Sequence, residues 1–326
     1  MALQTKKVIS LLPSAAEIIA LITDDTNNSI QLVGRSHEDD YPSYVTSLPI
    51  LTAPKTKFTT SADVDVQVSQ LLAEGKSLYE LDKGLLKSLK PDVIVTQDLC
   101  NVCSIDLNTV QKIAKEMDPV PDVVTLSPMS IEDVVESVRK VGLSLGAIEK
   151  SDKVISSLQS RIKIAREAAS RSKNNGLEPV KVAFFEWCDP IYLGGHWTPQ
   201  LIRWSNGIQV INDCKDEEIA QAGASPSYVR FRVPPQEILD SKPEILIICP
   251  CGLNLDETKK EYEKTLLPSN WWPELANNAK KIALVDGNQM FNRPGPRLVD
   301  ALEWLVGYIN DMPEIIPKNF PYENLK

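Results

Sequence analysis

The sequence contains few histidines and no long apolar run. Only 2 of its 326 residues are His, so a site that uses imidazole has two candidates at most. No stretch of about 18 uninterrupted apolar residues occurs, which argues against a membrane-spanning helix. The P-loop, GxGxxG, GxSxG and HExxH patterns are also missing. The commonest nucleotide-binding, serine-hydrolase and zinc-protease motifs therefore give no support to an enzyme, and no catalytic residue is assigned.

Basic residues are outnumbered by acidic ones. The chain has 35 Lys and Arg against 44 Asp and Glu, which gives a formal net charge of −9. Binding to nucleic acid needs clustered Lys and Arg, so we expect no nucleic-acid partner. Six cysteines are present. In a chain of this size, with an adequate core and no evident export signal, we expect free thiols rather than disulfides.

The N-terminus combines a basic start with an apolar run, as a signal peptide does. Pro13, Ser14 and Glu17 interrupt this run, so a first strand and helix fit better. Ser14 is expected as the N-cap of that helix, with Glu17 at the capping-box position. We therefore expect a cytoplasmic chain as given, or a periplasmic one if the sequence is a trimmed mature form.

Residues 146–172 form the most regular segment, with apolar residues near helical spacing and no Gly or Pro after Gly146. A helix of this length is roughly 35 to 40 Å long, long enough to join two lobes. We therefore expect an N-terminal α/β lobe at 1–145, a spanning helix at 146–174 and a C-terminal α/β lobe at 175–326.

Two parts of the chain share one layout. Residues 85–100 (LLKSLKPDVIVTQDLC) and 237–252 (EILDSKPEILIICPCG) each give an amphipathic run, Lys-Pro-acid, a short apolar strand and a Cys-bearing loop. Strands alternate with helices on both sides of the long helix, which predicts two Rossmann-like lobes with mainly parallel sheets and a ligand cleft between them. The predicted strands are 8–12, 30–33, 92–96, 123–126, 180–186, 208–211, 245–248 and 282–285; further helices are predicted at 13–22, 61–75, 79–89, 108–117, 198–205, 234–239, 270–276 and after Pro296.

In parallel α/β sheets, ligands bind at the carboxyl ends of the strands. Aromatic, polar and basic residues on the loops expected there are suited to a planar ligand that carries polar groups. The candidate ligand-binding residues are Ser14, His37, Tyr41, Gln97, Trp187, Tyr192, His196, Trp197, Phe291 and Arg293.

Both histidines lie on such loops, and several cysteines lie near predicted strand ends. Nitrogen and sulfur ligands together suit zinc or a similar ion. The candidate metal ligands are His37, His196, Cys100, Cys103 and Cys251, with Glu38 or Asp39 in support. A structural interpretation stays open, in which each His is hydrogen-bonded within its loop and the cysteines only pack; burial is expected for Cys188 and Cys214.

Several motifs resemble, in order, those of the cobalamin and iron-siderophore group of solute-binding proteins, in the branch labelled cobalamin-binding. They are SLLPSAAEII, VGRSHEDDYP, QDLCNVC, GGHWTPQLI, CPCG, WPEL and FNRPGPRLVD. The resemblance implies two lobes joined by a rigid helix, a bulky metal chelate as ligand and, for exported members, delivery to an ABC transporter permease.

The sequence thus predicts a protein that binds a metal chelate such as a cobalamin-like corrinoid. Direct binding of a transition metal such as zinc is the alternative, and a metal-dependent enzyme or thiol oxidoreductase built on the same scaffold also stays open. Cobalamin and zinc are the candidate cofactors.

Overall fold

The computed structural model describes residues 5–23, 29–98, 106–174, 178–214 and 232–326. These residues form two compact units, each described here by itself. Unit 1 comprises Met1–Lys57, Val66–Pro128 and Glu132–Leu158; unit 2 comprises Phe58–Asp65, Met129–Ile131 and Gln159–Lys326.

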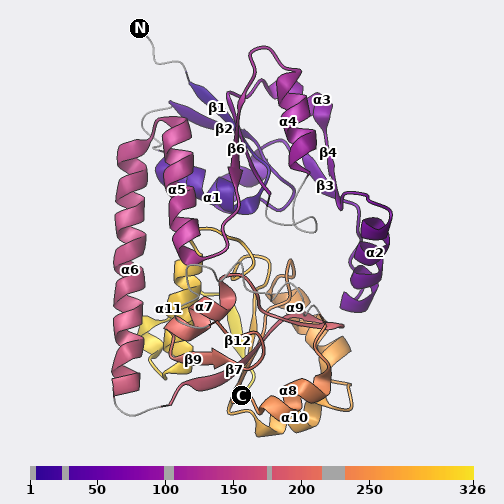
Figure 1. Ribbon diagram of the computed structural model, residues 1–326, viewed down its shortest axis with the longest axis vertical. Helices are drawn as coiled ribbons and strands as arrows, with labels where there is room; N and C mark the ends of the chain where they lie inside the picture. The colour runs from indigo at the N-terminus through magenta and orange to yellow at the C-terminus, as the bar shows by residue number, and fades with distance from the viewer. Residues whose placement is uncertain (1–4, 24–28, 99–105, 175–177, 215–231) are drawn as a thin grey trace. The chain divides into compact units, whose positions relative to one another are not determined.

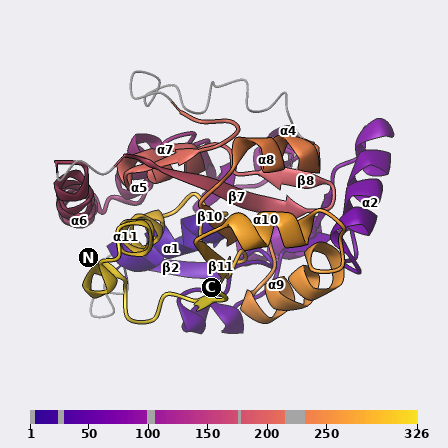
Figure 2. The same ribbon diagram turned by 90° about the horizontal axis from the view of Figure 1, so that it is seen from below.

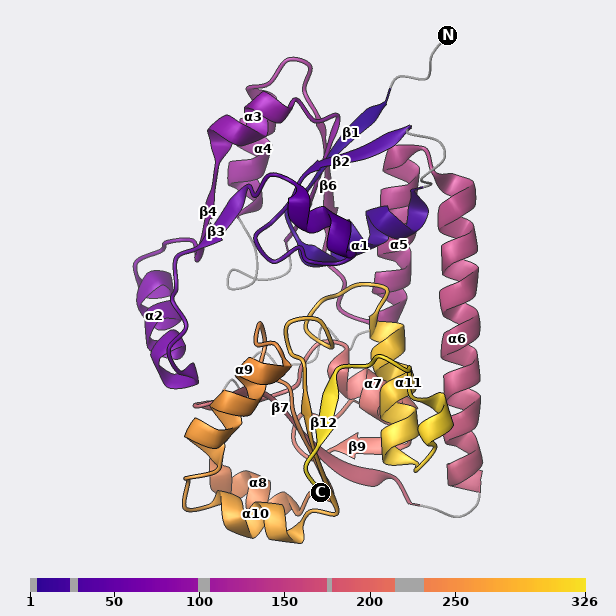
Figure 3. The same ribbon diagram turned by 180° about the vertical axis from the view of Figure 1, so that it is seen from behind.

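Unit 1 is built on a four-stranded parallel sheet in the order β2-β1-β5-β6. Helices α1 and α5 lie on one side of this sheet, and α3 and α4 lie on the other (Figures 1 and 3). The strands are β1 (Lys6–Ser10), β2 (Ile30–Gly34), β5 (Val93–Gln97) and β6 (Asp122–Leu126); the helices are α1 (Pro13–Ile22), α3 (Lys83–Leu89), α4 (Leu107–Lys115) and α5 (Ile131–Leu145).

The central strand β5 is buried along its whole length, as expected for a parallel strand that is covered on both faces. On one face, Ile9 and Ile94 pack with Leu86 of α3 and with Val110 and Ile113 of α4. The sequence predicted all four strands of this sheet and three of its helices, because their apolar residues recur with the spacing that burial requires.

A small hairpin-like sheet adds to unit 1 and corrects one predicted helix. Strand β3 (Thr52–Pro54) pairs antiparallel with β4 (Tyr79–Leu81), so the helix predicted from residue 79 begins only at Lys83. Asp82 caps that helix, since its side chain accepts a hydrogen bond from the backbone N–H of Leu85. A 3₁₀ turn (Ser43–Ser47) and helix α2 (Ser61–Ala73) complete this part of the chain.

Unit 2 contains a six-stranded sheet in the order β12-β11-β10-β7-β8, with β9 also paired to β7. Helices α7 and α11 lie on one side, and α8, α9 and α10 on the other (Figures 1 and 3). The strands are β7 (Val180–Cys188), β8 (Ile191–Leu193), β9 (Gly207–Gln209), β10 (Ile245–Ile248), β11 (Lys281–Val285) and β12 (Tyr322–Asn324); the helices are α7 (Thr198–Trp204), α8 (Pro235–Ser241), α9 (Leu255–Glu261), α10 (Trp272–Asn278) and α11 (Leu298–Ile309).

Two strands and one α-helix described in unit 2 are absent from the prediction. Strand β8 runs antiparallel beside the end of β7 (Figure 2), and β12 pairs antiparallel with β11. Helix α9 is the third. Its sequence does carry a signal, because Asn254 and Glu257 form a reciprocal capping box.

The repeat predicted from the sequence appears in the structure as two parallel sheets with the same strand order. The parallel strands of unit 2 follow the order β9-β7-β10-β11, which matches β2-β1-β5-β6 in unit 1. The carboxylate of Asp92 accepts a hydrogen bond from the backbone N–H of Lys7, and that of Glu244 accepts one from the backbone N–H of Lys181. An acidic residue at the equivalent position thus links β5 to β1 in unit 1 and β10 to β7 in unit 2.

The long helix α6 (Ile148–Asn174) is confirmed. Gly146, with a φ of +74°, separates it from α5. Its residues through Leu158 belong to unit 1 and those from Gln159 to unit 2. In unit 2, Arg161 binds the carboxylates of Asp300 and Glu303 on α11. Among the described helices, none is both long and apolar enough to cross a membrane.

Candidate functional site

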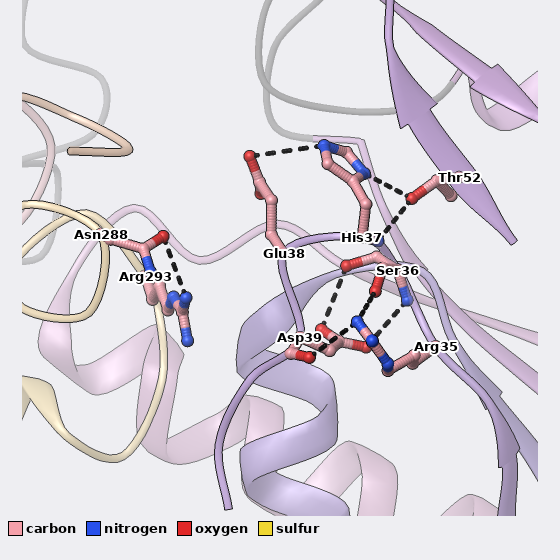
Figure 4. A network of polar contacts seen from close by, with 8 residues as sticks. All are labelled: Arg35, Ser36, His37, Glu38, Asp39, Thr52, Asn288 and Arg293. Atoms are coloured by element: carbon pink, nitrogen blue, oxygen red, sulfur yellow. Dashed lines mark hydrogen bonds and ion pairs between the residues drawn. The ribbon is translucent and has the colours of Figure 1, made fainter. Parts of the chain in front are cut away.

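The loop after β2 carries His37 within a network of polar contacts (Figure 4). The backbone N–H of His37 donates to Thr52 Oγ1 at 2.9 Å, and His37 Nδ1 lies 2.6 Å from the same oxygen. The other ring nitrogen, Nε2, lies 3.8 Å from Glu38 Oε1. The His37 ring also contacts Tyr79, with ring centroids 5.6 Å apart. Thr52 thus holds one ring nitrogen of His37, and the other faces a carboxylate.

Arg35 organises this loop, although the sequence gave no reason to single it out. Its guanidinium is buried and donates to three backbone carbonyls, those of Ser36, Asp39 and Thr46, at 3.0, 3.0 and 3.1 Å. The carboxylate of Asp39 accepts from the backbone N–H and the hydroxyl of Ser36. The turn that presents His37 is therefore fixed by hydrogen bonds to charged groups, which are stronger than neutral ones.

Burial lowers the pKa of His37, and the positive charge of Arg35 lowers it further, while Glu38 acts in the opposite direction. Burial thus favours the neutral imidazole, which is the state that can coordinate a metal ion. The hydrogen bond to Thr52 fits a purely structural role of His37 and equally a metal-binding role. A bond of this kind to one ring nitrogen is also what orients a metal-binding His.

The other unit 1 candidates are divided between core and surface. Ser14 is 1% exposed and is the second residue of α1, whose N-cap is Leu12 without a side-chain cap; the predicted Ser14 cap is wrong. Gln97 is buried at the end of β5, whereas Tyr41 is 45% exposed. Cys100 and Cys103 lie outside the described residues.

In unit 2, His196 and Trp197 lie together at the start of α7. Their rings are 5.2 Å apart, and burial lowers the pKa of His196. The Trp197 indole N–H donates to the carbonyl of Phe291 at 2.6 Å. Just before them, Gly194 has no room for a side chain, because an added Cβ would lie 2.7 Å from Thr198 Cγ2. Close packing therefore accounts for Gly194.

Phe291 belongs to the core rather than to an open loop. Its side chain is 1% exposed, and its ring lies 4.8 Å from that of Phe184 and 6.0 Å from that of Trp304. A ring enclosed in this way cannot stack on a ligand without rearrangement of the core. We therefore withdraw Phe291 as a ligand contact and treat it as a packing residue.

Glu186, at the end of β7, was not predicted. Its Oε2 accepts a hydrogen bond from the backbone N–H of Gly195 at 3.1 Å. Burial raises the pKa of Glu186, and this hydrogen bond only partly opposes the shift. Nearby, Cys249 is fully buried, whereas Cys251 is exposed. Cys188 and Cys214 are buried, as expected.

The loop after β11 carries a second polar group (Figure 4). Asp286 accepts hydrogen bonds from the backbone N–H groups of Asn288 and Gln289, at 3.0 and 2.8 Å. The guanidinium of Arg293 donates to Asn288 Oδ1 at 3.1 Å and is only 6% exposed. Burial raises the pKa of Asp286, and the positive charge of Arg293 is one of the influences that lower it. A buried guanidinium at a strand end suits a carboxylate or phosphate group.

Trp187 and Tyr192 are engaged by the first turn of α2. The Trp187 indole N–H donates to the carbonyl of Ser61 at 3.1 Å, and the Tyr192 hydroxyl donates to Asp65 Oδ1. Glu261 accepts from both the backbone N–H and the hydroxyl of Ser61. Both aromatic candidates thus contact the start of α2, whose residues through Asp65 belong to unit 2.

The proposed mixed metal site is not assembled from the residues that the structure describes. Within the described ranges, no group of three or more His, Cys, Asp or Glu side chains is placed to hold a metal ion. Glu38 lies beside His37, with Oε1 3.8 Å from Nε2.

The solved structures most similar to this chain share its fold at low sequence identity. The periplasmic heme-binding protein BhuT in complex with two hemes has a TM-score of 0.67 at 15% identity, with 95% of this chain and 99% of that chain covered. A periplasmic heme-binding protein from Pseudomonas aeruginosa gives 0.64 at 13%, with 94% of each chain covered. The periplasmic vitamin B12-binding protein BtuF of Vibrio cholerae gives 0.60 at 15%, covering 95% and 98%.

The chain has the fold of the helical-backbone periplasmic binding proteins. No protein-family model matches it, and a search of curated proteins found no match. The helical-backbone periplasmic binding fold accounts for two similar α/β units and the long helix α6, as the motifs in the sequence indicated. At such low identities the likeness establishes the fold, and the ligand has to be argued from the site.

Proposed function

We propose that this protein is a solute-binding protein that binds a metal chelate, and that His37 contacts the metal of that chelate. The observation that carries the proposal is the fixed position of His37 on its loop. Burial lowers the pKa of its imidazole, and its loop at a carboxyl strand end is fixed by hydrogen bonds that Arg35 donates and that Thr52 shares with His37. Such preorganisation lowers the entropic cost of binding. The fold supports it, since its structural neighbours include a heme-binding protein, a vitamin B12-binding protein and a protein of an ABC-type Fe3+-hydroxamate transport system.

Tetrapyrroles with an open axial position are the chelates we favour, and a cobalamin-like corrinoid remains the first candidate. Heme is the other candidate, because several similar structures are those of periplasmic heme-binding proteins. A bare transition metal is a weaker alternative, because the described residues gather no set of three metal ligands. A chelate brings most of its own metal ligands, so a single protein imidazole is sufficient.

The test is titration of the purified protein with hemin, aquocobalamin and a ferric hydroxamate, followed by ultraviolet–visible absorption. We expect saturable binding of one of them, with a shift of its absorption bands. His37→Ala should weaken binding by about tenfold or more, as losses around metal ligands usually do. Glu116→Gln is the control, because Glu116 is an exposed residue that forms an ion pair with Lys87. Equal affinity in wild type and His37→Ala would overturn the role of His37.

We further propose that the protein acts outside the cytoplasm and delivers its ligand to an ABC transporter permease. This placement is supported over the cytoplasmic one by similar structures. They include periplasmic binding proteins and an ABC transporter substrate-binding protein. Fractionation of the source cells, with an antibody against this chain, tests it. A signal confined to the cytosolic fraction would exclude the delivery role.

A further inference from the structure

One oxygen atom of Thr52 contacts both the backbone and the ring of His37. Its Oγ1 lies 2.9 Å from the backbone nitrogen of His37 and 2.6 Å from the ring nitrogen Nδ1. Thr52 is 5% exposed, whereas the His37 side chain is 21% exposed. Nδ1 is therefore the ring nitrogen held by the protein, and Nε2, 3.8 Å from Glu38 Oε1, is the one left for other interactions.

We propose that Thr52 is a positioning residue that makes Nε2 the ligand atom of His37 and that supports the imidazole both before and after ligand binding. This inference rests on the proposed function of His37. A hydroxyl group offers one proton and two lone pairs. The backbone N–H of His37 occupies one lone pair of Oγ1, so one proton and one lone pair remain for Nδ1.

The proton and lone pair that remain let the Thr52 hydroxyl either donate to a bare Nδ1 or accept from Nδ1–H. Coordination of a metal through Nε2 places the ring proton on Nδ1, and the hydroxyl then accepts from it. Thr52 can serve either state by rotation of its hydroxyl hydrogen alone.

A purely structural role for Thr52 makes a different prediction. If the hydroxyl only fastens the loop through the backbone N–H of His37, then changes elsewhere in the same turn should have similar effects. Ser36 provides that comparison, because its hydroxyl donates to Asp39 Oδ1 at 3.1 Å and belongs to the same turn. Its described hydrogen bonds do not involve the imidazole.

The experiment compares Thr52→Val, Thr52→Ser and Ser36→Ala by ¹⁵N nuclear magnetic resonance of the histidine rings in the ligand-free protein. The chain has only two histidines, so the signals that disappear in His37→Gln are assigned at once. We expect the Nδ1 signal of His37 in wild type, Thr52→Ser and Ser36→Ala to have the chemical shift of a hydrogen-bonded ring nitrogen, and Thr52→Val to lose this shift. Valine keeps the β-branched shape that suits strand β3. Thr52→Ala replaces it if the valine variant unfolds.

The same variants are then titrated with hemin and aquocobalamin. Thr52→Val should weaken binding by about tenfold, as loss of the partner of a metal-binding His does, and Thr52→Ser should restore it. An unchanged Nδ1 shift in Thr52→Val, or equal losses of affinity in Thr52→Val and Ser36→Ala, would overturn the proposal. If wild type binds neither chelate, the proposed function fails and the ligand role of Nε2 with it, while the resonance experiment still decides whether Thr52 holds Nδ1.

Discussion

Lys90 and Lys242 end two equivalent helices in the same left-handed conformation, with φ angles of 47° and 51°. Each is followed by a proline and then by an acidic residue that binds the neighbouring strand. The left-handed conformation is unfavourable for any residue with a Cβ, and glycine adopts it without this cost.

Lys242→Gly should therefore stabilise the protein. We expect a gain of about 0.5–1 kcal/mol, since relief of left-handed strain exceeds the extra entropy that glycine has in the unfolded chain. Chemical denaturation measures the change. Lys260→Gly, within the ordinary helix α9, should instead cost about 1 kcal/mol. A loss of stability in both variants would contradict the explanation.

Glu186→Gln should raise stability at neutral pH. Burial raises the native pKa of Glu186, so the native state binds this proton more tightly than the unfolded state does. The group then favours folding below its unfolded pKa, and this contribution is lost as pH rises through the native pKa. The advantage of Glu186→Gln should accordingly be largest at pH 7 to 8 and should shrink toward pH 4, as thermal denaturation across this range would show.

Glu244→Gln is the control with the opposite sign. A hydrogen bond from Lys280 lowers the pKa of Glu244, so its ionised form stabilises the native state above the unfolded pKa. This variant should be less stable than wild type at neutral pH, and the difference should disappear as pH falls through the native pKa. Equal pH profiles for the two variants would show that burial of Glu186 is not the cause.

Arg35→Met should loosen the turn that presents His37. The variant loses three hydrogen bonds to backbone carbonyls, and we expect a cost of about 2–3 kcal/mol, because bonds to charged groups are strong and the acceptors remain. Amide hydrogen exchange should rise at Asp39 and Leu51, with weaker chelate binding. Arg139→Met, which removes an exposed ion pair with Asp152, should change stability by less than about 1 kcal/mol.

Phe291→Ala should act through the core. Removal of a buried phenylalanine typically costs about 3–5 kcal/mol, and the surrounding rings of Phe184 and Trp304 would lose their contacts. Phe58→Ala is the comparison, because Phe58 is 40% exposed and should cost far less. A stable Phe291→Ala protein with reduced chelate affinity would restore Phe291 as a ligand contact.

The sequence predicted the sheets well because their strands are continuous apolar runs, such as those that became β5 and β10. It missed β3, β4, β8 and β12, which have three residues each. Such short strands carry no periodicity, and their pairing depends on partners elsewhere in the chain. Helix α9 could have been found from its capping box.

The site was predicted less completely than the fold. His37 was identified from its residue type and its place after a strand. Thr52 is 15 residues further on, and only the position of β3 brings it to the imidazole. Phe291 shows the opposite error, because a loop position in the sequence does not reveal that the loop folds inward. Contacts between distant segments leave no local pattern to read.

The attachment of α2 also limits how the polypeptide could be divided into fragments. Unit 2 includes Phe58–Asp65, which precede most of unit 1 in the chain. A fragment that begins after α6 would expose the Trp187 indole and would leave the buried carboxylate of Glu261 without the N–H and hydroxyl of Ser61. No single cut therefore yields two self-sufficient halves. Unit 2 completes its fold with Phe58–Asp65, which the ribosome produces well before the rest of that unit.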